Sequence, residues 1–385
     1  MLEKNGKSIR LTADMLMEDA CRLARLHEWG EEGFRVPLGQ LIAYFREKYG
    51  ADKKMNLRFQ NAIRALLVNR LFIRDNFESH PEILRVPLHR PLFIVGLSRT
   101  GSTLLHRAIA RDLSCRVLLY WEALHPFIGR NVGLNHEEKS KKLAELKIKE
   151  MYLRMPDYFH IHEIKATAPE ECNVLMRHTF CSMSFASEWH LPRYAQWLVN
   201  QDTTGSYRYY RKLLQLLLWH KPGNFPVLKC PSHLLNLDAI LNVFPDANFV
   251  WLHRDPISAI PSYLNLLSVF WGNGLSKSFV DFICHYSIRS LEMGMRVEKK
   301  IGPGQFLNVG YNELVNDPIA VILSIYNYFK YSLAPGVETD LRKWLKENPR
   351  HKHGVHTYGL EKFGLTHADI KNRFSRYYDE YGHFL

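Results

Sequence analysis

The segment from Pro91 to His106, PLFIVGLSRTGSTLLH, constrains the fold of this chain more than any other part of its sequence. Four continuous apolar residues predict a buried strand, and a turn bounded by Gly96 and Gly101 separates them from a helical pattern that begins at Ser102. Such a strand, turn and helix direct backbone N–H groups and the positive end of the helix dipole at an anion. The segment therefore predicts a phosphate-binding loop. An ordinary strand-to-helix turn is the alternative, because glycine spacing alone is weak evidence.

The loop differs from a nucleotidase loop at one position. Gly96-x4-Gly101-Ser102-Thr103 matches the Walker A pattern except that Ser102 stands where that pattern has its lysine. The cation lies inside the loop instead, as Arg99. This displacement indicates that the loop binds phosphate without the chemistry of the Walker lysine.

The charge of the chain favours an acidic ligand. Its 385 residues carry 51 Lys and Arg against 39 Asp and Glu, a formal net charge of +12. The basic residues are spread along the chain, which argues against nucleic acid and for a small polyanionic cofactor.

The sequence shows no pattern that would direct the chain to secretion or into a membrane. Met1 to Arg10 is polar, and the longest apolar stretch, from Leu213 to Trp219, is interrupted by Gln215, so no signal peptide and no membrane span are predicted. The six cysteines include no CxxC pair, which predicts no disulfide framework and a reducing, cytoplasmic setting.

The remaining sequence predicts an α/β fold with a helical front. Residues 1–85 contain three amphipathic helical patterns and form a predicted helical cap, packed on an α/β domain over residues 86–385. Strands alternate with helices in that domain, which predicts a P-loop-like parallel sheet with helices on both faces. The expected strands are 92–95, 117–121, 227–229, 248–252 and 306–309.

Other segments receive simpler predictions. Residues 155–172 look like a loop, the charged helix over 136–153 presents a solvated face, and the helix expected over 366–378 is the last of the chain. The aromatic segment from Trp189 to Trp197 is either the wall of a pocket or part of the core.

Four charged residues follow predicted strands: Arg99, Glu122, Lys229 and Arg254. In open parallel sheets the ligand lies at the carboxyl ends of the strands. We therefore expect these side chains to converge on one site.

These motifs resemble the sulfotransferases that use 3′-phosphoadenosine 5′-phosphosulfate (PAPS), in the broad branch shared with bacterial and Golgi-type enzymes. The family's 5′-phosphosulfate loop is similar to residues 96–103, and its 3′-phosphate motif is similar to residues 253–262. The strand-end lysine of the family corresponds to Lys229. The likeness runs from about Pro91 to Tyr311.

The resemblance implies a role for each matching residue. Arg99 and the backbone amides over 100–103 hold the 5′-phosphosulfate, while Arg254 and Ser262 bind the 3′-phosphate. Lys229 stabilises the bridging oxygen or the sulfuryl group. The residues of the loop that are expected to contact the cofactor are Arg99, Thr100, Gly101, Ser102 and Thr103.

The general base is less directly indicated. Glu122 resembles the glutamate base of the Golgi-type branch, although a carboxylate that only pairs with Arg99 or Lys229 would look the same. Cytosolic members use a histidine close to the lysine, which makes His233 the second candidate. His125 and His162 are further candidates.

The C-terminal region departs from the cytosolic pattern. Those enzymes close the cofactor site with an Arg-Lys-Gly segment, whereas this chain has RHKHG at 350–354, so Lys352 or His353 would cover the 3′-phosphate. No metal is expected, because the tail histidines have no accompanying cysteine or carboxylate cluster.

The resemblance thus implies an enzyme that moves a sulfuryl group from PAPS to an acceptor hydroxyl, with a small alcohol, phenol or lipid favoured. Sulfation of a carbohydrate, a P-loop kinase, and a nucleotide-binding protein without catalysis are the alternatives. The expected partner is a small hydroxylated molecule, with neither nucleic acid nor a metal.

Overall fold

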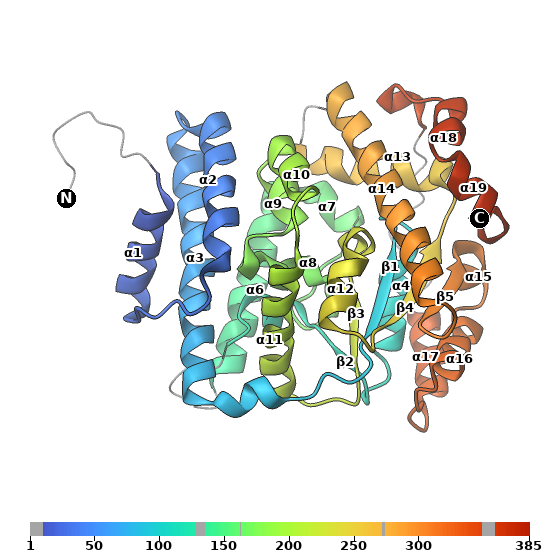
Figure 1. Ribbon diagram of the computed structural model, residues 1–385, viewed down its shortest axis with the longest axis horizontal. Coiled ribbons are helices and arrows are strands. Elements are labelled where there is room, and N and C mark those ends of the chain that lie inside the picture. Colours follow the sequence, from blue (N-terminus) through green and yellow to red (C-terminus); the bar gives the residue numbers. More distant parts are fainter. Residues whose placement is uncertain (1–10, 128–134, 162, 272–273, 349–358) are drawn as a thin grey trace.

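A parallel sheet forms the centre of the molecule (Figure 1). The computed structural model describes residues 11–127, 135–161, 163–271, 274–348 and 359–385. Within them the sheet has five strands in the order β2-β3-β1-β4-β5, every pair parallel. The strands are β1 (Leu92–Gly96), β2 (Arg116–Val117), β3 (Pro226–Lys229), β4 (Asn248–His253) and β5 (Phe306–Gly310). Because β1 is the middle strand, the loop that follows it leaves from the centre of the sheet's carboxyl edge.

Both faces of the sheet are covered, as the sequence predicts. Side chains along β1 alternate between two hydrophobic clusters: Phe93 and Val95 belong to one, and Leu92 and Ile94 to the other. The first cluster includes helices α11 (Thr204–His220), α12 (Leu237–Val243) and α14 (Lys277–Ile301). The second includes α4 (Ser102–Ile109), α16 (Pro318–Phe329) and α17 (Val337–Glu347). The α/β class is confirmed.

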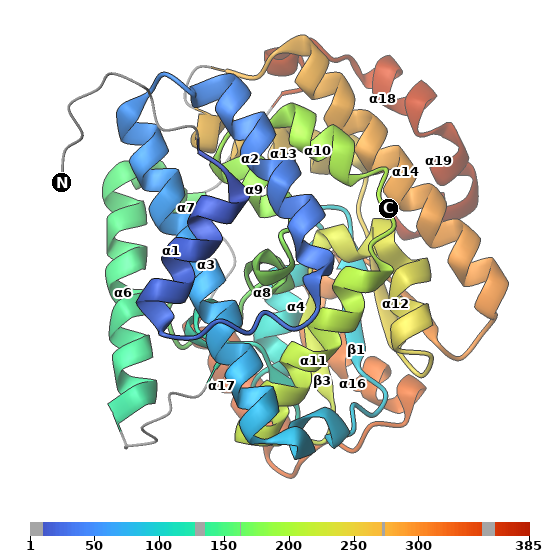
Figure 2. The same ribbon diagram turned by 60° about the vertical axis from the view of Figure 1, so that its left-hand side comes forward.

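Three N-terminal helices pack on one side of this core, at the left of Figure 1 and toward the viewer in Figure 2. They are α1 (Ala13–Ala24), α2 (Arg35–Tyr49) and α3 (Lys53–Ser79). Phe45 of α2 stacks on Phe59 of α3 with ring centroids 3.8 Å apart, and both rings pack against Trp189. The cap helices therefore share a hydrophobic cluster with one face of the sheet. The domain boundary at residue 85 remains a prediction.

The other helices surround the carboxyl edge of the sheet or close its ends. They are α5 (Tyr120–Leu124), α6 (Asn135–Arg154), α7 (Pro156–Ile161), α8 (Cys172–Met176), α9 (Met183–Glu188), α10 (Pro192–Leu198), α13 (Pro256–Trp271), α15 (Tyr311–Asn316), α18 (His367–Arg373) and α19 (Ser375–Tyr381). No described helix has the length and apolar character needed to cross a bilayer. All six cysteines are free thiols.

The predicted strand over 117–121 is wrong beyond Val117. The chain leaves β2 there and enters α5, whose start is capped when the Glu122 carboxylate accepts the N–H of Leu119 at 3.1 Å. A short apolar run does not distinguish a strand from a buried helix, which explains the error. Two further expectations need correction: the loop over 155–172 contains α7, and the single helix expected over 366–378 is divided into α18 and α19.

Close packing between α14 and β4 gives a test of this fold. A Cβ atom at Gly294 would lie 2.6 Å from the Trp251 ring, and the ring is fully buried. We expect Gly294→Ala to lower the free energy of unfolding by about 1–3 kcal/mol, because the ring has no room to move. The midpoint of urea denaturation measures the change.

Gly39→Ala is the matched control. Gly39 also lies in a helix, and a Cβ atom added there has no atom within 4 Å, so this substitution should stabilise the protein by about 0.5–1 kcal/mol. Equal effects of the two substitutions would contradict the packing.

Candidate active site

A cavity of about 420 Å³ lies at the carboxyl edge of the sheet. The loop after β1 forms one part of its wall and Arg254 after β4 forms a second. Further parts come from helices α3, α6 and α13, from residues between 170 and 188, and from the segment after β3. The loop residues on the wall are Ser98, Arg99, Gly101, Ser102 and Thr103. The cavity is thus placed where the parallel topology predicts a ligand.

Two glycines allow the loop to turn sharply. Gly96 has φ +147°, and a Cβ atom there would lie 2.6 Å from the carbonyl oxygen of Leu252. Gly101 has φ +86° and immediately precedes α4. Any larger residue at Gly96 would push β1 away from β4. The loop therefore brings the first N–H groups of α4 to the cavity wall, which is a favourable place for an anion.

Three residues predicted to bind the cofactor are in contact with one another. The Arg99 side chain donates from Nε to the Ser262 hydroxyl at 3.1 Å. Arg254 donates from Nη1 to the Arg99 carbonyl at 2.6 Å, and its guanidinium lies 4.1 Å from the centroid of the Tyr311 ring. The loop after β1 and the segment after β4 therefore form one basic surface.

The Thr100 hydroxyl has a different role from its neighbours. It is buried and donates to the Leu97 carbonyl at 2.8 Å, so it holds the loop closed and is not part of the cavity wall. Ser102 and Thr103 do belong to that wall.

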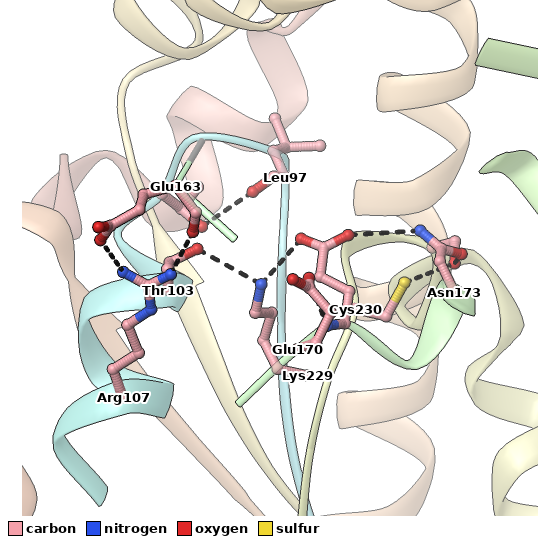
Figure 3. Close-up of polar contacts among 11 residues, drawn as sticks. Leu97, Thr103, Arg107, Glu163, Glu170, Asn173, Lys229 and Cys230 are labelled. Atoms are coloured by element: carbon pink, nitrogen blue, oxygen red, sulfur yellow. Dashed lines mark hydrogen bonds and ion pairs between the residues drawn. The ribbon is translucent and has the colours of Figure 1, made fainter. Parts of the chain in front are cut away.

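Lys229 connects the loop to an acidic segment (Figure 3). It ends β3, and its side chain is 2% exposed. Its ammonium lies 3.4 Å from the Thr103 hydroxyl and 2.8 Å from Oε1 of Glu171. A buried ammonium requires such a partner, since an unpaired charge in the interior is strongly unfavourable.

Sequence reasoning missed the two carboxylates of this acidic segment, Glu170 and Glu171, which both line the cavity. Glu171 is 25% exposed, and its second oxygen accepts from the Asn173 amide at 3.4 Å. Glu170 is buried and accepts the backbone N–H of Glu171 at 2.8 Å. The segment is held in place by Pro169, which forms a β-bridge to Leu119. The available signal was a pair of adjacent glutamates inside a stretch expected to be a loop.

The structure does not support Glu122 as the base. Its carboxylate is 1% exposed and is absent from the cavity wall. One oxygen accepts from Arg116 Nη2 at 2.7 Å and the other accepts the Leu119 N–H. Because this carboxylate is buried and lies outside the cavity wall, a substrate hydroxyl bound in the cavity has no access to it.

Neither of the two histidine candidates that the structure describes, His125 and His233, lines the cavity. His233 is 1% exposed, contacts the Tyr207 hydroxyl through Nδ1 at 2.7 Å and packs edge-on against Phe93. Burial lowers its pKa to about 3, so it is a neutral core residue. His125 is not on the cavity wall either. His162, Lys352 and His353 lie outside the described residues.

The aromatic segment over 189–197 belongs to the core and not to this cavity. Trp189, at the end of α9, is fully buried against Phe45 and Phe59 of the cap helices. Neither Trp197 nor Trp271 is part of the cavity wall. The apolar part of that wall comes instead from α6, α13 and neighbouring segments: Met151, Met155, Tyr158, Ile164, Leu266 and Phe270.

The two candidate roles of Glu122 can be separated by experiment. We expect Glu122→Gln to lower the free energy of unfolding by about 3–5 kcal/mol, because Arg116 would lose its charged partner in the interior. The turnover number per folded molecule should not change. Denaturation midpoints and activity, both normalised to the folded fraction, measure these effects. A loss of about 10²–10⁴-fold in turnover at unchanged stability would restore Glu122 as the base.

Comparison with known proteins identifies the family. The model of the sulfotransferase family matches residues 91–335, which include every strand of the sheet. The chain belongs to the sulfotransferase family. Among the described residues of this sulfotransferase, no group of three or more His, Cys, Asp or Glu could hold a metal ion.

Curated and solved relatives agree with that family. The chain is 22% identical over 330 residues to the omega-hydroxy-beta-dihydromenaquinone-9 sulfotransferase Stf3 of Mycobacterium bovis, an alignment that covers 76% of this chain and 75% of Stf3. Sulfotransferase STF9 of Mycobacterium avium is similar in structure, with a TM-score of 0.86, 27% identity and 98% of both chains covered. Sulfotransferase STF1 of Mycobacterium tuberculosis H37Rv has a TM-score of 0.80 and 28% identity, covering 96% of this chain and 100% of STF1.

Proposed function

We propose that this sulfotransferase moves a sulfuryl group from PAPS to the hydroxyl of a small alcohol, phenol or lipid, with Glu171 as the general base. One observation carries the proposal: the Lys229 ammonium contacts both Thr103 on the phosphate-binding loop and Glu171 on the cavity wall. A group bound at the loop would therefore lie close to a lysine and to a carboxylate that a substrate can reach.

The residues around the loop fit a donor with phosphates at both ends of its ribose. Arg99 and the N–H groups at the start of α4 would hold the 5′-phosphosulfate. Arg254 would bind the 3′-phosphate together with Ser262, since a guanidinium is a planar fork that matches phosphate oxygens. Each charge-assisted hydrogen bond contributes about 1.5–3 kcal/mol. Lys352 remains a further proposed contact.

The donor supplies the sulfuryl group, and the residues of this chain supply the acid–base chemistry. The Glu171 carboxylate takes the proton of the acceptor hydroxyl as the oxygen–sulfur bond forms. Lys229 stabilises the negative charge that develops on the departing phosphate oxygen. The low exposure of Lys229 strengthens this interaction, because little water screens the charge.

The acceptor side of the cavity supports a molecule with an apolar body. Its wall includes two methionines and an aromatic ring, Met151, Met155 and Phe270. Stf3 is named for a hydroxylated menaquinone, which is a lipid. Both observations favour a hydroxylated lipid or similar alcohol as the acceptor.

Transfer of radiolabelled sulfate from PAPS to a panel of alkyl alcohols, phenols, sterols and sugars tests the activity. We expect Glu171→Gln to lower the turnover number by about 10²–10⁴-fold while binding of the product nucleotide, 3′-phosphoadenosine 5′-phosphate, is unchanged. Glu138→Gln, at an exposed position on α6, is the control and should keep full activity. Full turnover by Glu171→Gln would exclude Glu171 as the base.

Hydrolysis or phosphoryl transfer from MgATP, without sulfate transfer, would indicate a P-loop kinase instead of a sulfotransferase.

The 3′-phosphate site has its own test. Arg254→Lys should weaken binding of 3′-phosphoadenosine 5′-phosphate by about tenfold, because lysine cannot form a two-bond fork. Adenosine 5′-phosphate, which lacks the 3′-phosphate, should bind the variant and the wild type equally. Calorimetric titration with the two nucleotides measures the difference. An equal loss for both would place Arg254 at another part of the nucleotide.

A further inference from the structure

A second part of the cavity wall carries an excess of positive charge. It is formed by α3, α6 and the short turn after α8, and its cations are Arg58, Lys147, Arg154 and Arg177. Glu188 is the one carboxylate that the structure describes on this part of the wall; the other two lining carboxylates, Glu170 and Glu171, belong to the segment beside Lys229.

Protein carboxylates neutralise only some of these cations. Glu188 forms an ion pair with Arg177 and lies 3.9 Å from Arg58 Nη2. Arg154 lies 3.6 Å from Glu150, whose side chain is 66% exposed, so this attraction is weakened by solvent. Lys147 makes no ion pair within the described part of the chain.

Lys147 shares the cavity wall with three other cations. Its side chain is exposed to solvent at the cavity wall, and desolvation by the nearby protein atoms lowers its pKa. The nearby Arg177 and Arg154 also lower the pKa, whereas Glu188 and Glu150 raise it. A negatively charged ligand in the cavity would relieve this repulsion.

The donor does not account for these cations. Its phosphates would be held by the loop with Arg99, by Arg254 and by Lys229, which come from the carboxyl edge of the sheet. The four extra cations come from helices outside the sheet, and apolar side chains such as Met151 and Met155 lie on the same helix α6 or just after it.

We propose that the acceptor is an anionic amphiphile: a hydroxylated molecule with an apolar body and a carboxylate or phosphate group that binds Lys147 beside Arg177. This inference rests on the proposed sulfotransfer, because it names the class of acceptor for the same cavity. The hydroxyl would lie at Glu171, the apolar body along Met151 and Phe270, and the anion at Lys147.

A matched pair of probes tests the charge requirement. 12-Hydroxydodecanoate and 1,12-dodecanediol share a chain length and a terminal hydroxyl, and only the first carries a negative charge. With the site saturated by 3′-phosphoadenosine 5′-phosphate, calorimetry should show that the hydroxy acid binds at least about tenfold more tightly than the diol. Lys147→Gln should remove most of this preference, and Lys147→Glu should reverse it. Lys149→Gln is the control, because Lys149 is exposed on the same helix and lies outside the cavity wall.

Equal binding of the two probes, no binding of the hydroxy acid, or a preference that survives Lys147→Gln would overturn the inference. Nucleotide binding and labelled sulfate transfer, measured on the same samples, report on the proposed function separately. A neutral alcohol that is sulfated without any preference for the acid would refute the anionic acceptor and leave sulfotransfer intact. A preference for the acid without nucleotide binding or transfer would refute sulfotransfer.

Discussion

The contact of Lys229 with Thr103 and Glu171 is the interaction on which the site depends. Ile94 pairs with Lys229 in the register of β1 and β3, so the lysine ends its strand beside the one that leads into the loop. The side chain is almost completely buried, and it is stable there because the Glu171 carboxylate accompanies it. The pair therefore joins a segment between helices to the centre of the sheet. This arrangement places a base candidate next to a phosphate-binding loop.

The two sides of the cavity have different structural origins. The donor side comes from the carboxyl edge of the sheet, where Gly96 and Gly101 fix the loop and Arg254 follows the adjacent strand. The acceptor side comes from α3, α6 and α13, with Arg58 contributed by the N-terminal helices. In the proposed reaction, the edge of the sheet would hold the donor and the surrounding helices would contact the acceptor.

The grouping of residues on the proposed donor side was largely predictable from the sequence, because these residues follow strands whose apolar runs are clear. Arg99, Arg254 and Ser262 are brought into contact by the loop after β1 and the segment after β4. The proposed general base, Glu171, could not be predicted from its position after an apolar strand. Glu122 follows an apolar run that turns from strand into helix, and its partner Arg116 lies six residues earlier. Glu171 reaches the site through the bridge between Leu119 and Pro169, a contact over 50 residues of chain that no local pattern encodes.

The acceptor side was the least predictable part. The helix over 136–153 has charges on most of its surface, so sequence periodicity identifies Lys147 as one solvated lysine among several. Only its place on the cavity wall, which also includes Arg177, separates it from Lys149 in the folded chain. A single sequence does not show which cations from separate helices will share one cavity wall.

A crystal structure of the complex with 3′-phosphoadenosine 5′-phosphate tests the central claim most directly. We expect the 5′-phosphate at the N–H groups of the loop over 100–103, near Lys229 and Glu171, and the 3′-phosphate at Arg254 and Ser262. A nucleotide bound in the opposite orientation, or with its 5′-phosphate away from Lys229, would contradict it.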